Sequence, residues 1–314
     1  MPPLPPGEAV FVRSRAGDRL RAALFGRPGE ARGSVVLSPG RTEPLEKYGE
    51  VIGELAERGF AVLVHDWVGQ GLSDRLHRDP LRGHVRGGAA RFLDGLHDVL
   101  AAHEARLPQP WIAVGHSMGG GLTALMLSRG EARFAGAVLC APMLGVNLGG
   151  RSPAEVRTGA LLMRLLGRGA ALPQPQTDPL HDRFEGNVLT HERARWERMQ
   201  ALIAARPALR LGGPTWDWLR FALDLSRELA APGAAERIAV PFAVVTAGEE
   251  RLVDNAAADR FVRRLPHGSL VEAAGASHEI LMEADDARAL FWREFDCVAD
   301  AVAPQSRSGA PSGK

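Results

Sequence analysis

The pattern most able to carry chemistry in this chain consists of five consecutive residues, Gly115, His116, Ser117, Met118 and Gly119. It lies directly after an apolar run at residues 111–114 and opens a helical pattern at 118–129. A nucleophilic serine needs this strand, sharp turn and helix, because the turn exposes the hydroxyl and glycine tolerates the close packing. Such a motif also occurs as an ordinary glycine-rich turn. Ser117 is therefore a candidate nucleophile only if the sequence also offers a base and an acid to activate it.

A serine hydroxyl becomes a good nucleophile when a base accepts its proton and an acid holds that base in one tautomer. In the strand, turn and helix arrangement, the partners follow in the order serine, acid, histidine. The late histidines are His267 and His278. His278 follows a predicted strand at residues 269–272, whereas His267 precedes it and should lie at the opposite edge of the sheet. We therefore expect His278 to be the base.

The acid is expected at the carboxyl end of a predicted strand at residues 241–246. Asp254 fits this position, and Glu249 and Glu250 are alternatives. Asp is also a favoured helix N-cap, and Asp254 precedes a predicted helix at residues 256–265. The spacing leaves Asp254 open to either role.

Negative charge develops on the carbonyl oxygen during attack, and two backbone amides are needed to stabilise it. One donor should be Met118, which follows the nucleophile at a helix N-terminus. The second should come from the loop after the predicted strand at residues 35–37. Residues expected to support the elbow and this loop are Gly115, His116, Gly119, Gly40 and Glu43.

Short apolar runs alternate with helical patterns through the first 144 residues, after a predicted hairpin at 9–13 and 20–25. Apolar runs bounded by helices predict strands buried on both faces of a parallel sheet. The predicted strands are 34–37, 60–64, 111–114 and 135–140, and the predicted helices are 48–58, 89–105 and 118–129. After residue 240 the alternation resumes, and it ends in a predicted helix at 285–298.

The segment 145–237 interrupts this alternation with helical patterns at 159–166, 191–205 and 216–229. We expect one discontinuous core of residues 1–144 and 238–303, a helical cap at 145–237 and a disordered tail at 304–314. The cap carries 13 Arg against 10 Asp or Glu, an excess compatible with a phosphate-bearing substrate. Side chains expected to line a hydrophobic substrate pocket are Tyr48, Leu162, Trp216 and Trp218.

Composition excludes several classes of protein. The 314 residues carry a net charge of +1, so no overall field attracts nucleic acid or an anionic membrane. No apolar run approaches the roughly 18 residues of a membrane span, and Met1–Val10 does not resemble a signal peptide. The chain has only two cysteines, so we expect no disulfide framework and a cytoplasmic location. Neither cysteine has a neighbour at metal-ligand spacing, and we expect neither a metal nor a cofactor. Peripheral contact with the inner membrane face and the oligomeric state stay open.

Four stretches together resemble the α/β-hydrolase superfamily, in its lysophospholipase and monoacylglycerol lipase branch, often called serine aminopeptidase-like. They are residues 39–43 with Tyr48, residues 65–73, residues 115–120, and residues 249–255 with 275–280. The resemblance covers about residues 10–300 and is closest to bacterial lysophospholipases. Many members carry histidine before the first glycine, where this chain has Pro39.

The resemblance implies a fold with a mostly parallel sheet, flanking helices and a cap inserted before the strand that precedes the acid. It assigns Ser117 as nucleophile, Asp254 as acid and His278 as base, with the amides of Arg41 and Met118 as the oxyanion hole. We therefore expect hydrolysis of single-chain lipid esters, with lysophospholipid or monoacylglycerol as substrate. The alternatives are a carboxylesterase or acyltransferase acting on small esters, and a catalytically silent binding protein on the same scaffold.

Overall fold

The protein is described from a computed structural model, which covers residues 5–84, 86–175 and 178–304. Its centre is an eight-stranded sheet in the order β1-β2-β4-β3-β5-β6-β7-β8. The strands are β1 (Gly7–Arg13), β2 (Arg19–Phe25), β3 (Gly33–Ser38), β4 (Phe60–His65), β5 (Trp111–His116), β6 (Phe134–Cys140), β7 (Phe242–Ala247) and β8 (Gly268–Ala273). The β1–β2 and β2–β4 pairs are antiparallel and the others are parallel, which confirms the predicted hairpin and parallel sheet.

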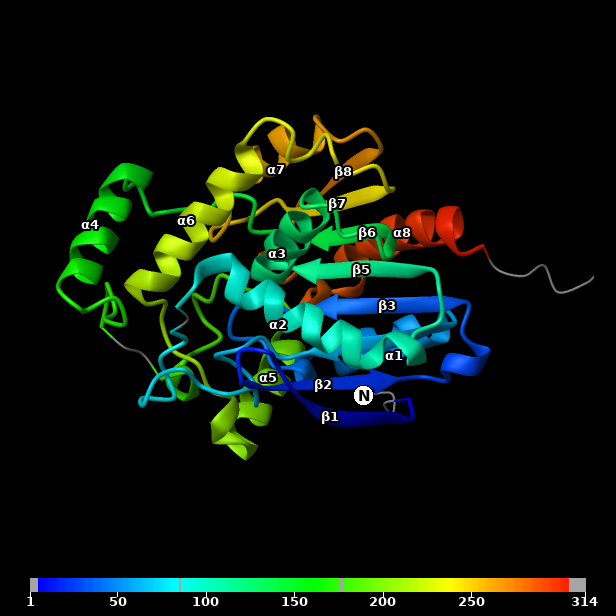
Figure 1. Cartoon of the computed structure of the whole chain (residues 1–314), viewed down its shortest axis with the longest axis horizontal. Helices are drawn as coiled ribbons and strands as arrows, with labels where there is room; N and C mark the ends of the chain where they lie inside the picture. The colour runs from blue at the N-terminus through cyan, green and yellow to red at the C-terminus, as the bar shows by residue number, and fades with distance from the viewer. Residues whose placement is uncertain (1–4, 85, 176–177, 305–314) are drawn as a thin grey trace, which may run out of the picture.

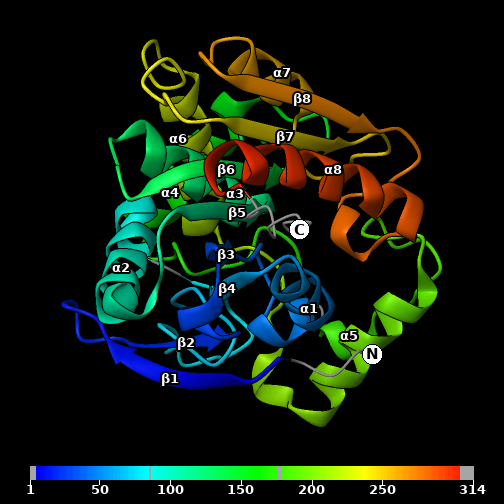
Figure 2. The ribbon, with the colours of Figure 1, turned by 90° about the vertical axis from the view of Figure 1, so that its right-hand side faces the viewer.

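Helices cover both faces of the sheet (Figure 2). One apolar cluster joins the sheet to α1 (Gly49–Glu57) and α8 (Asp285–Val302). A second cluster joins the other face to α2 (Gly88–His103), α3 (Ser117–Ser128) and α7 (Asn255–Val262). Every residue of β3, β4, β5 and β7 is buried, because apolar side chains meet a layer of helices on either face.

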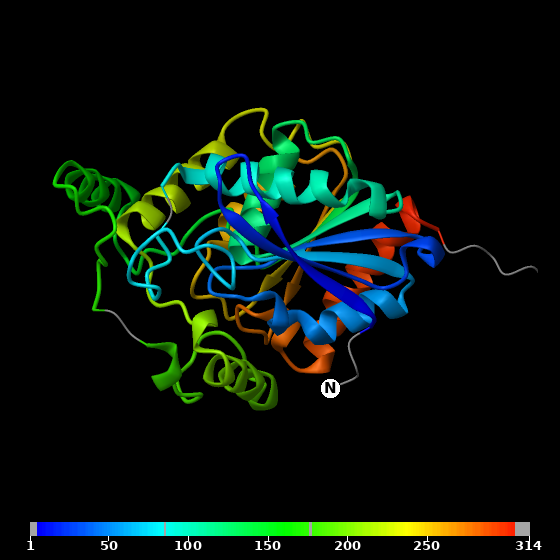
Figure 3. The same ribbon diagram turned by 60° about the horizontal axis from the view of Figure 1, so that its bottom comes forward.

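The chain between β6 and β7 forms α4 (Pro153–Leu165), α5 (Arg193–Ala205) and α6 (Trp216–Ala230). These helices lie at the end of the molecule toward which β3, β5 and β6 point (Figures 1 and 3). Helix α4 begins six residues earlier than predicted, because Ser152 and Glu155 form a reciprocal capping box around Pro153. Helix α6 packs into the same apolar cluster as α2 and α3. The division into a core and a separate cap stays a prediction.

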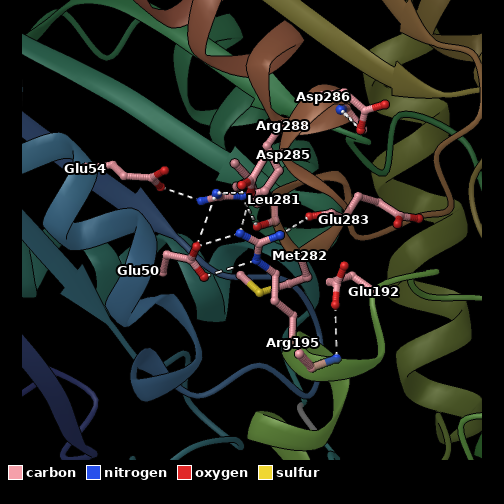
Figure 4. A network of polar contacts seen from close by, with 12 residues as sticks. Glu50, Glu54, Glu192, Arg195, Leu281, Met282, Glu283, Asp285, Asp286 and Arg288 are labelled. Carbon is pink, nitrogen blue, oxygen red and sulfur yellow. Dashed lines mark hydrogen bonds and ion pairs between the residues drawn. The ribbon is translucent and has the colours of Figure 1, made fainter. Parts of the chain in front are cut away.

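Ion pairs hold α5 against the core (Figure 4). The guanidinium of Arg195 lies 2.6 Å from a carboxylate oxygen of Glu50 in α1 and 2.6 Å from one of Asp285 at the start of α8. Arg195 also donates to the carbonyl of Glu283. These contacts fix the position of α5 at the sheet edge where the parallel strands end.

Within the described ranges, no helix combines the length and the apolar character needed to span a bilayer. Both cysteines are unpaired; Cys140 is buried and Cys297 is exposed. The predicted disordered tail falls, apart from Pro304, outside the residues that the structure describes.

Candidate active site

The turn between β5 and α3 holds Ser117 in a conformation that glycines on either side make possible. Ser117 has a φ of 49°, in the left-handed region that residues other than glycine rarely adopt. A Cβ on Gly119 would lie 2.1 Å from the carbonyl oxygen of Ser38, and one on Gly115 would lie 2.8 Å from the Cα of Gly120. Gly119 therefore lets β3 and α3 approach closely, and Gly115 lets the end of β5 lie against α3, while the turn projects the serine from the sheet edge.

The side chains of Ser117, His278 and Glu250 form one hydrogen-bonded chain. The Nε2 of His278 lies 2.9 Å from the Oγ of Ser117. On the other side of the ring, Nδ1 lies 2.7 Å from the Oε2 of Glu250. A base on the serine and a carboxylate on the far nitrogen of that base are the geometry of an activated nucleophile.

Glu250 is positioned by the tight turn that follows β7. Its side chain is 3% exposed, and its Oε1 accepts hydrogen bonds from the amides of Leu252 and Val253. Burial by itself raises the pKa of this carboxyl, but the hydrogen bond and charge of His278 and the two amides outweigh burial and lower it. Glu250 is therefore a carboxylate oriented toward His278.

The choice of Asp254 as acid was wrong, since the structure does not bring this residue to the histidine. Its side chain is 41% exposed, caps α7 by accepting from the amide of Ala256, and lies 3.3 Å from Arg260. Its carboxylate therefore acts as the N-cap of α7, the second of the two roles that the sequence allowed. Glu249, the other alternative to Asp254, is also exposed, and its Oε2 lies 3.4 Å from Nε2 of His191.

The loop after β3 lies against the elbow and is held by side chains from elsewhere. The carbonyls of Pro39 and Gly40 accept hydrogen bonds from Trp67 Nε1 and Gln70 Nε2, at 2.7 Å and 2.8 Å. Proline at position 39 is accommodated, because the contact there uses its carbonyl and needs no amide hydrogen. The amide of Gly40 donates to Glu43. The loop is thus fixed on both sides of Gly40, one residue before Arg41.

Glu43 is the centre of a buried polar network that joins this loop to the elbow. Its Oε2 accepts from the hydroxyl of Tyr48 at 2.5 Å and lies 2.9 Å from Nδ1 of His116, while Lys47 donates to its Oε1 at 2.7 Å. The other ring nitrogen of His116 lies 3.2 Å from the backbone carbonyl of His278. One carboxylate therefore connects the loop, the residue before the nucleophile and the segment that carries the histidine.

The charges within this network stabilise one another. Burial alone raises the pKa of Glu43, but the charges and hydrogen bonds of His116 and Lys47 lower it well below its usual range. The pKa of His116 is raised, because Glu43 more than offsets the effect of burial. An ion pair buried this completely is sensitive to the loss of one partner.

We expect Glu43→Gln to lower the free energy of unfolding by about 3–5 kcal/mol, because the positive charges that face it lose their partner. A carboxylate with a lowered pKa stabilises the fold above its unfolded-state pKa of about 4, and this stabilisation is lost as the pH falls through the folded-state value. Urea unfolding at several pH values measures both effects. The gap to wild type should be widest near neutrality and shrink in acid.

Glu30→Gln is the matched control, because the Glu30 side chain is 72% exposed. It should change the unfolding free energy by no more than about 0.5 kcal/mol. Equal stability of the Glu43 and Glu30 variants would show that the network does not stabilise the fold.

A cavity of about 250 Å³ lies beside this site, between the loop after β3 and helix α5. Its wall includes Arg41, which follows Gly40, and Glu279, which follows His278. Apolar side chains that line the cavity come mainly from α5 and the segments around it: Leu189, Trp196, Met199, Ile203, Leu209 and Leu211.

The four residues predicted to contact substrate are not among those that line this cavity. Tyr48 is 1% exposed and is bound to Glu43, while Leu162 is 55% exposed on α4. Trp218 lies on α6 in the apolar cluster with α2 and α3, and its ring lies 5.3 Å from the guanidinium of Arg41. Trp216, the first residue of α6, packs near Gly159 of α4. The contact of these four residues with substrate stays a prediction, because apolar character alone does not say which helix faces the triad.

Comparison with known proteins places these features in a family. A family model described as serine aminopeptidase, S33 matches residues 29–285 of the chain. Lysophospholipase L2 of Escherichia coli K12 is 37% identical over 304 residues, which cover 89% of this chain and 82% of that protein.

Solved structures share the fold at low sequence identity. A soluble variant of monoglyceride lipase from Saccharomyces cerevisiae, in complex with a substrate analog, gives a TM-score of 0.75 at 18% identity and covers 96% of both chains. The α/β-hydrolase GrgF from a Penicillium species gives 0.69 at 20% identity and covers 95% of this chain and 99% of that one. The predicted α/β-hydrolase fold is confirmed.

Proposed function

Because the chain belongs to the serine aminopeptidase S33 family of α/β-hydrolases, we propose that it hydrolyses carboxylic esters of single-chain lipids through an acyl-enzyme on Ser117. The observation that carries this proposal is the hydrogen-bonded chain from Ser117 through His278 to Glu250. The relative from Escherichia coli is named a lysophospholipase, and the structural neighbour from yeast is a monoglyceride lipase. Both names support a lipid ester as substrate.

The reaction follows from the order of the groups in the hydrogen-bonded chain. Ser117 Oγ attacks the ester carbonyl carbon while its proton passes to Nε2 of His278, and Glu250 stabilises the resulting imidazolium. The tetrahedral intermediate collapses as the leaving alcohol takes that proton, which leaves the acyl group on Ser117. Water then attacks the acyl carbon with His278 again as base, and the fatty acid leaves as the serine regains its proton.

The amides of Arg41 and Met118 are proposed as the oxyanion hole. Met118 is the second residue of α3, so its amide has no acceptor within the helix. Arg41 lies in the loop that the close approach at Gly119 brings to the elbow, and Thr42 beside it has a φ of 69°. Loss of a single such donor in other enzymes reduces the rate by about 10²–10³-fold.

A panel of esters with matched acyl chains tests the substrate class. It should contain a lysophospholipid, a monoacylglycerol and p-nitrophenyl esters of short and long acyl chains. The proposal predicts the highest kcat/KM on one of the two lipids, because the cavity beside the triad has an apolar wall from α5 and the segments around it as well as charged residues. Hydrolysis confined to the short p-nitrophenyl esters would contradict a lipid substrate.

We also propose that α4 contacts the lipid surface that holds the substrate, on the cytoplasmic side of a membrane. The exposed leucines at its C-terminal end and C-cap form an apolar stretch, Leu161, Leu162, Leu165 and Leu166, with exposures of 52%, 55%, 75% and 61%. Arginines accompany it in the sequence at positions 151, 157, 164 and 168. Exposed leucines with nearby basic residues suit an interfacial helix on anionic lipid.

The double variant Leu162→Asp with Leu165→Asp should weaken binding to phosphatidylglycerol vesicles by at least about 10-fold, since each leucine buried in lipid contributes about 1.5–3 kcal/mol. Vesicle flotation measures the bound fraction. Phe11→Asp is the control, because Phe11 is 50% exposed on β1, far from α4 in Figure 1. If the control and the double variant bind equally well, α4 is not the contact surface.

A further inference from the structure

The side chain of Arg41 lines the cavity beside the triad without an acidic partner. Its Nη2 donates to the carbonyl of Gly212 at 2.5 Å, and its guanidinium lies 5.3 Å from the ring centroid of Trp218. Its Nε is buried without a hydrogen-bond partner, and no carboxylate oxygen of the described residues lies within 4.0 Å. Burial without a compensating charge lowers the pKa of Arg41 to about 10.

The other cations of the cavity wall are already paired. Arg195 is bound by Glu50 at 2.6 Å, as Figure 4 shows, and Lys47 is bound by Glu43 at 2.7 Å. Among the lining residues that the structure describes, Arg41 is therefore the cation available to an anionic ligand. A planar guanidinium with free donors matches the geometry of a phosphate group.

The position of Arg41 sets where such a group would lie in the substrate. Its backbone amide is the proposed donor to the ester carbonyl. In a 1-acyl lysophospholipid, a chain of covalent bonds runs from the ester carbonyl carbon to phosphorus. In arginine, the chain from the backbone nitrogen to Cζ has the same number of bonds. An ester held at the Arg41 amide therefore leaves its phosphodiester within reach of the Arg41 side chain.

The cavity wall also offers an unpaired carboxylate. Glu279 is bound by Lys47 at 2.5 Å, but no cationic nitrogen of the described residues lies within 4.0 Å of Asp182. Burial and the charge of Asp178 raise the pKa of Asp182. Asp182 would repel a headgroup that carries only negative charge and would attract an ammonium group.

We propose that the Arg41 guanidinium binds the phosphodiester of a zwitterionic lysophospholipid, whose ammonium group faces Asp182. This inference rests on the proposed function and specifies its substrate. It makes Arg41 the residue that favours lysophospholipid over monoacylglycerol, since a glycerol headgroup has no charge for the guanidinium to bind.

The test compares kcat/KM for lysophosphatidylethanolamine and for monoacylglycerol with the same acyl chain. Arg41→Gln should lower the ratio of the two values by about 10- to 100-fold, the effect of losing a hydrogen bond to a charged group. Arg41→Lys should lower the ratio less, because it keeps the charge. Arg206→Gln, which removes an exposed arginine from the same inserted segment, should leave the ratio unchanged. An unchanged ratio in Arg41→Gln would overturn the proposal, whether or not both activities fall together.

Asp182→Asn tests the ammonium contact separately. It should lower the preference for lysophosphatidylethanolamine over lysophosphatidylglycerol by about 10-fold. An unchanged preference would overturn the assignment of the ammonium group to Asp182.

Calorimetry with the Ser117→Ala variant gives a readout that needs no turnover. Glycerophosphoethanolamine should bind this variant, and the added Arg41→Gln change should abolish binding. Inorganic phosphate is the comparison ligand, and binding of phosphate as tight as that of the headgroup would overturn the zwitterionic assignment. If the wild type hydrolyses neither lysophosphatidylethanolamine nor monoacylglycerol, the proposed function itself has failed. If the wild type hydrolyses both, but Arg41→Gln leaves the ratio of their kcat/KM values unchanged, only the Arg41 site is ruled out.

Discussion

Replacing Ser117 by alanine should lower kcat for ester hydrolysis by about 10⁶-fold, the scale of loss when the nucleophile of a serine triad is removed. The hydroxyl is the group that forms the acyl-enzyme, and His278 has no other nucleophile within the hydrogen-bonded chain. The residual rate should come from the oxyanion hole and substrate binding alone. Initial rates on a monomeric p-nitrophenyl ester measure the loss without interference from a lipid surface.

Ser128→Ala is the control for this variant. Ser128 is buried at the end of α3, and its hydroxyl donates to the carbonyl of Leu125, away from the histidine. It should keep wild-type turnover to within about 3-fold, since a single helix-terminal hydrogen bond affects stability by only about 1 kcal/mol. Turnover near the wild-type level in Ser117→Ala would remove Ser117 from the mechanism.

Glu250→Gln should lower kcat by about 10⁴-fold, whereas Asp254→Asn should change it by less than about 3-fold. The amide group of glutamine would donate to Nδ1 of His278, which places the ring proton on Nε2 and leaves no lone pair to accept the proton of Ser117. Asparagine at position 254 keeps a side-chain oxygen that can cap α7. The pair of variants separates the two carboxyl groups by steady-state kinetics.

Glu250→Asp serves as the conservative variant. It keeps the negative charge but shortens the side chain by one methylene, so its loss of kcat should be smaller than that of Glu250→Gln. A large loss in Asp254→Asn together with wild-type kinetics in Glu250→Gln would restore Asp254 as the acid.

The serine and histidine could be predicted from the sequence because Ser117 directly follows one recognisable strand and His278 lies in the loop after another. The acid could not, because Glu250 and Asp254 both follow β7 within a few residues. The local turn decides between them: a Cβ on Gly248 would lie 2.1 Å from the carbonyl of Ala274, so β7 and the chain after β8 approach closely there. This contact places Glu250 within hydrogen-bond distance of His278 Nδ1 and leaves Asp254 at the start of α7. The sequence signal that favours Glu250 as the acid is the preference of Asp for the N-cap position, which assigns Asp254 to the helix.

Strand and helix positions were predictable from apolar periodicity, but the substrate cavity was not. Its wall depends on how α5 and the segments around it dock, and docking is fixed by contacts between distant residues. Arg195 of α5, for example, is held by Glu50 of α1. The charged residues of the wall, Arg41 among them, likewise come together through the fold and not through local sequence.

The most direct measurement of the central claim is peptide mass spectrometry after reaction with a fluorophosphonate probe. The proposed mechanism predicts one adduct per chain, on the peptide that contains Ser117, with no adduct in Ser117→Ala. Labelling should be slow in Glu250→Gln and unimpaired in Asp254→Asn, because only the former disturbs the base. Full labelling of Ser117→Ala, or an adduct on a different serine, would contradict the assignment of Ser117 as the nucleophile.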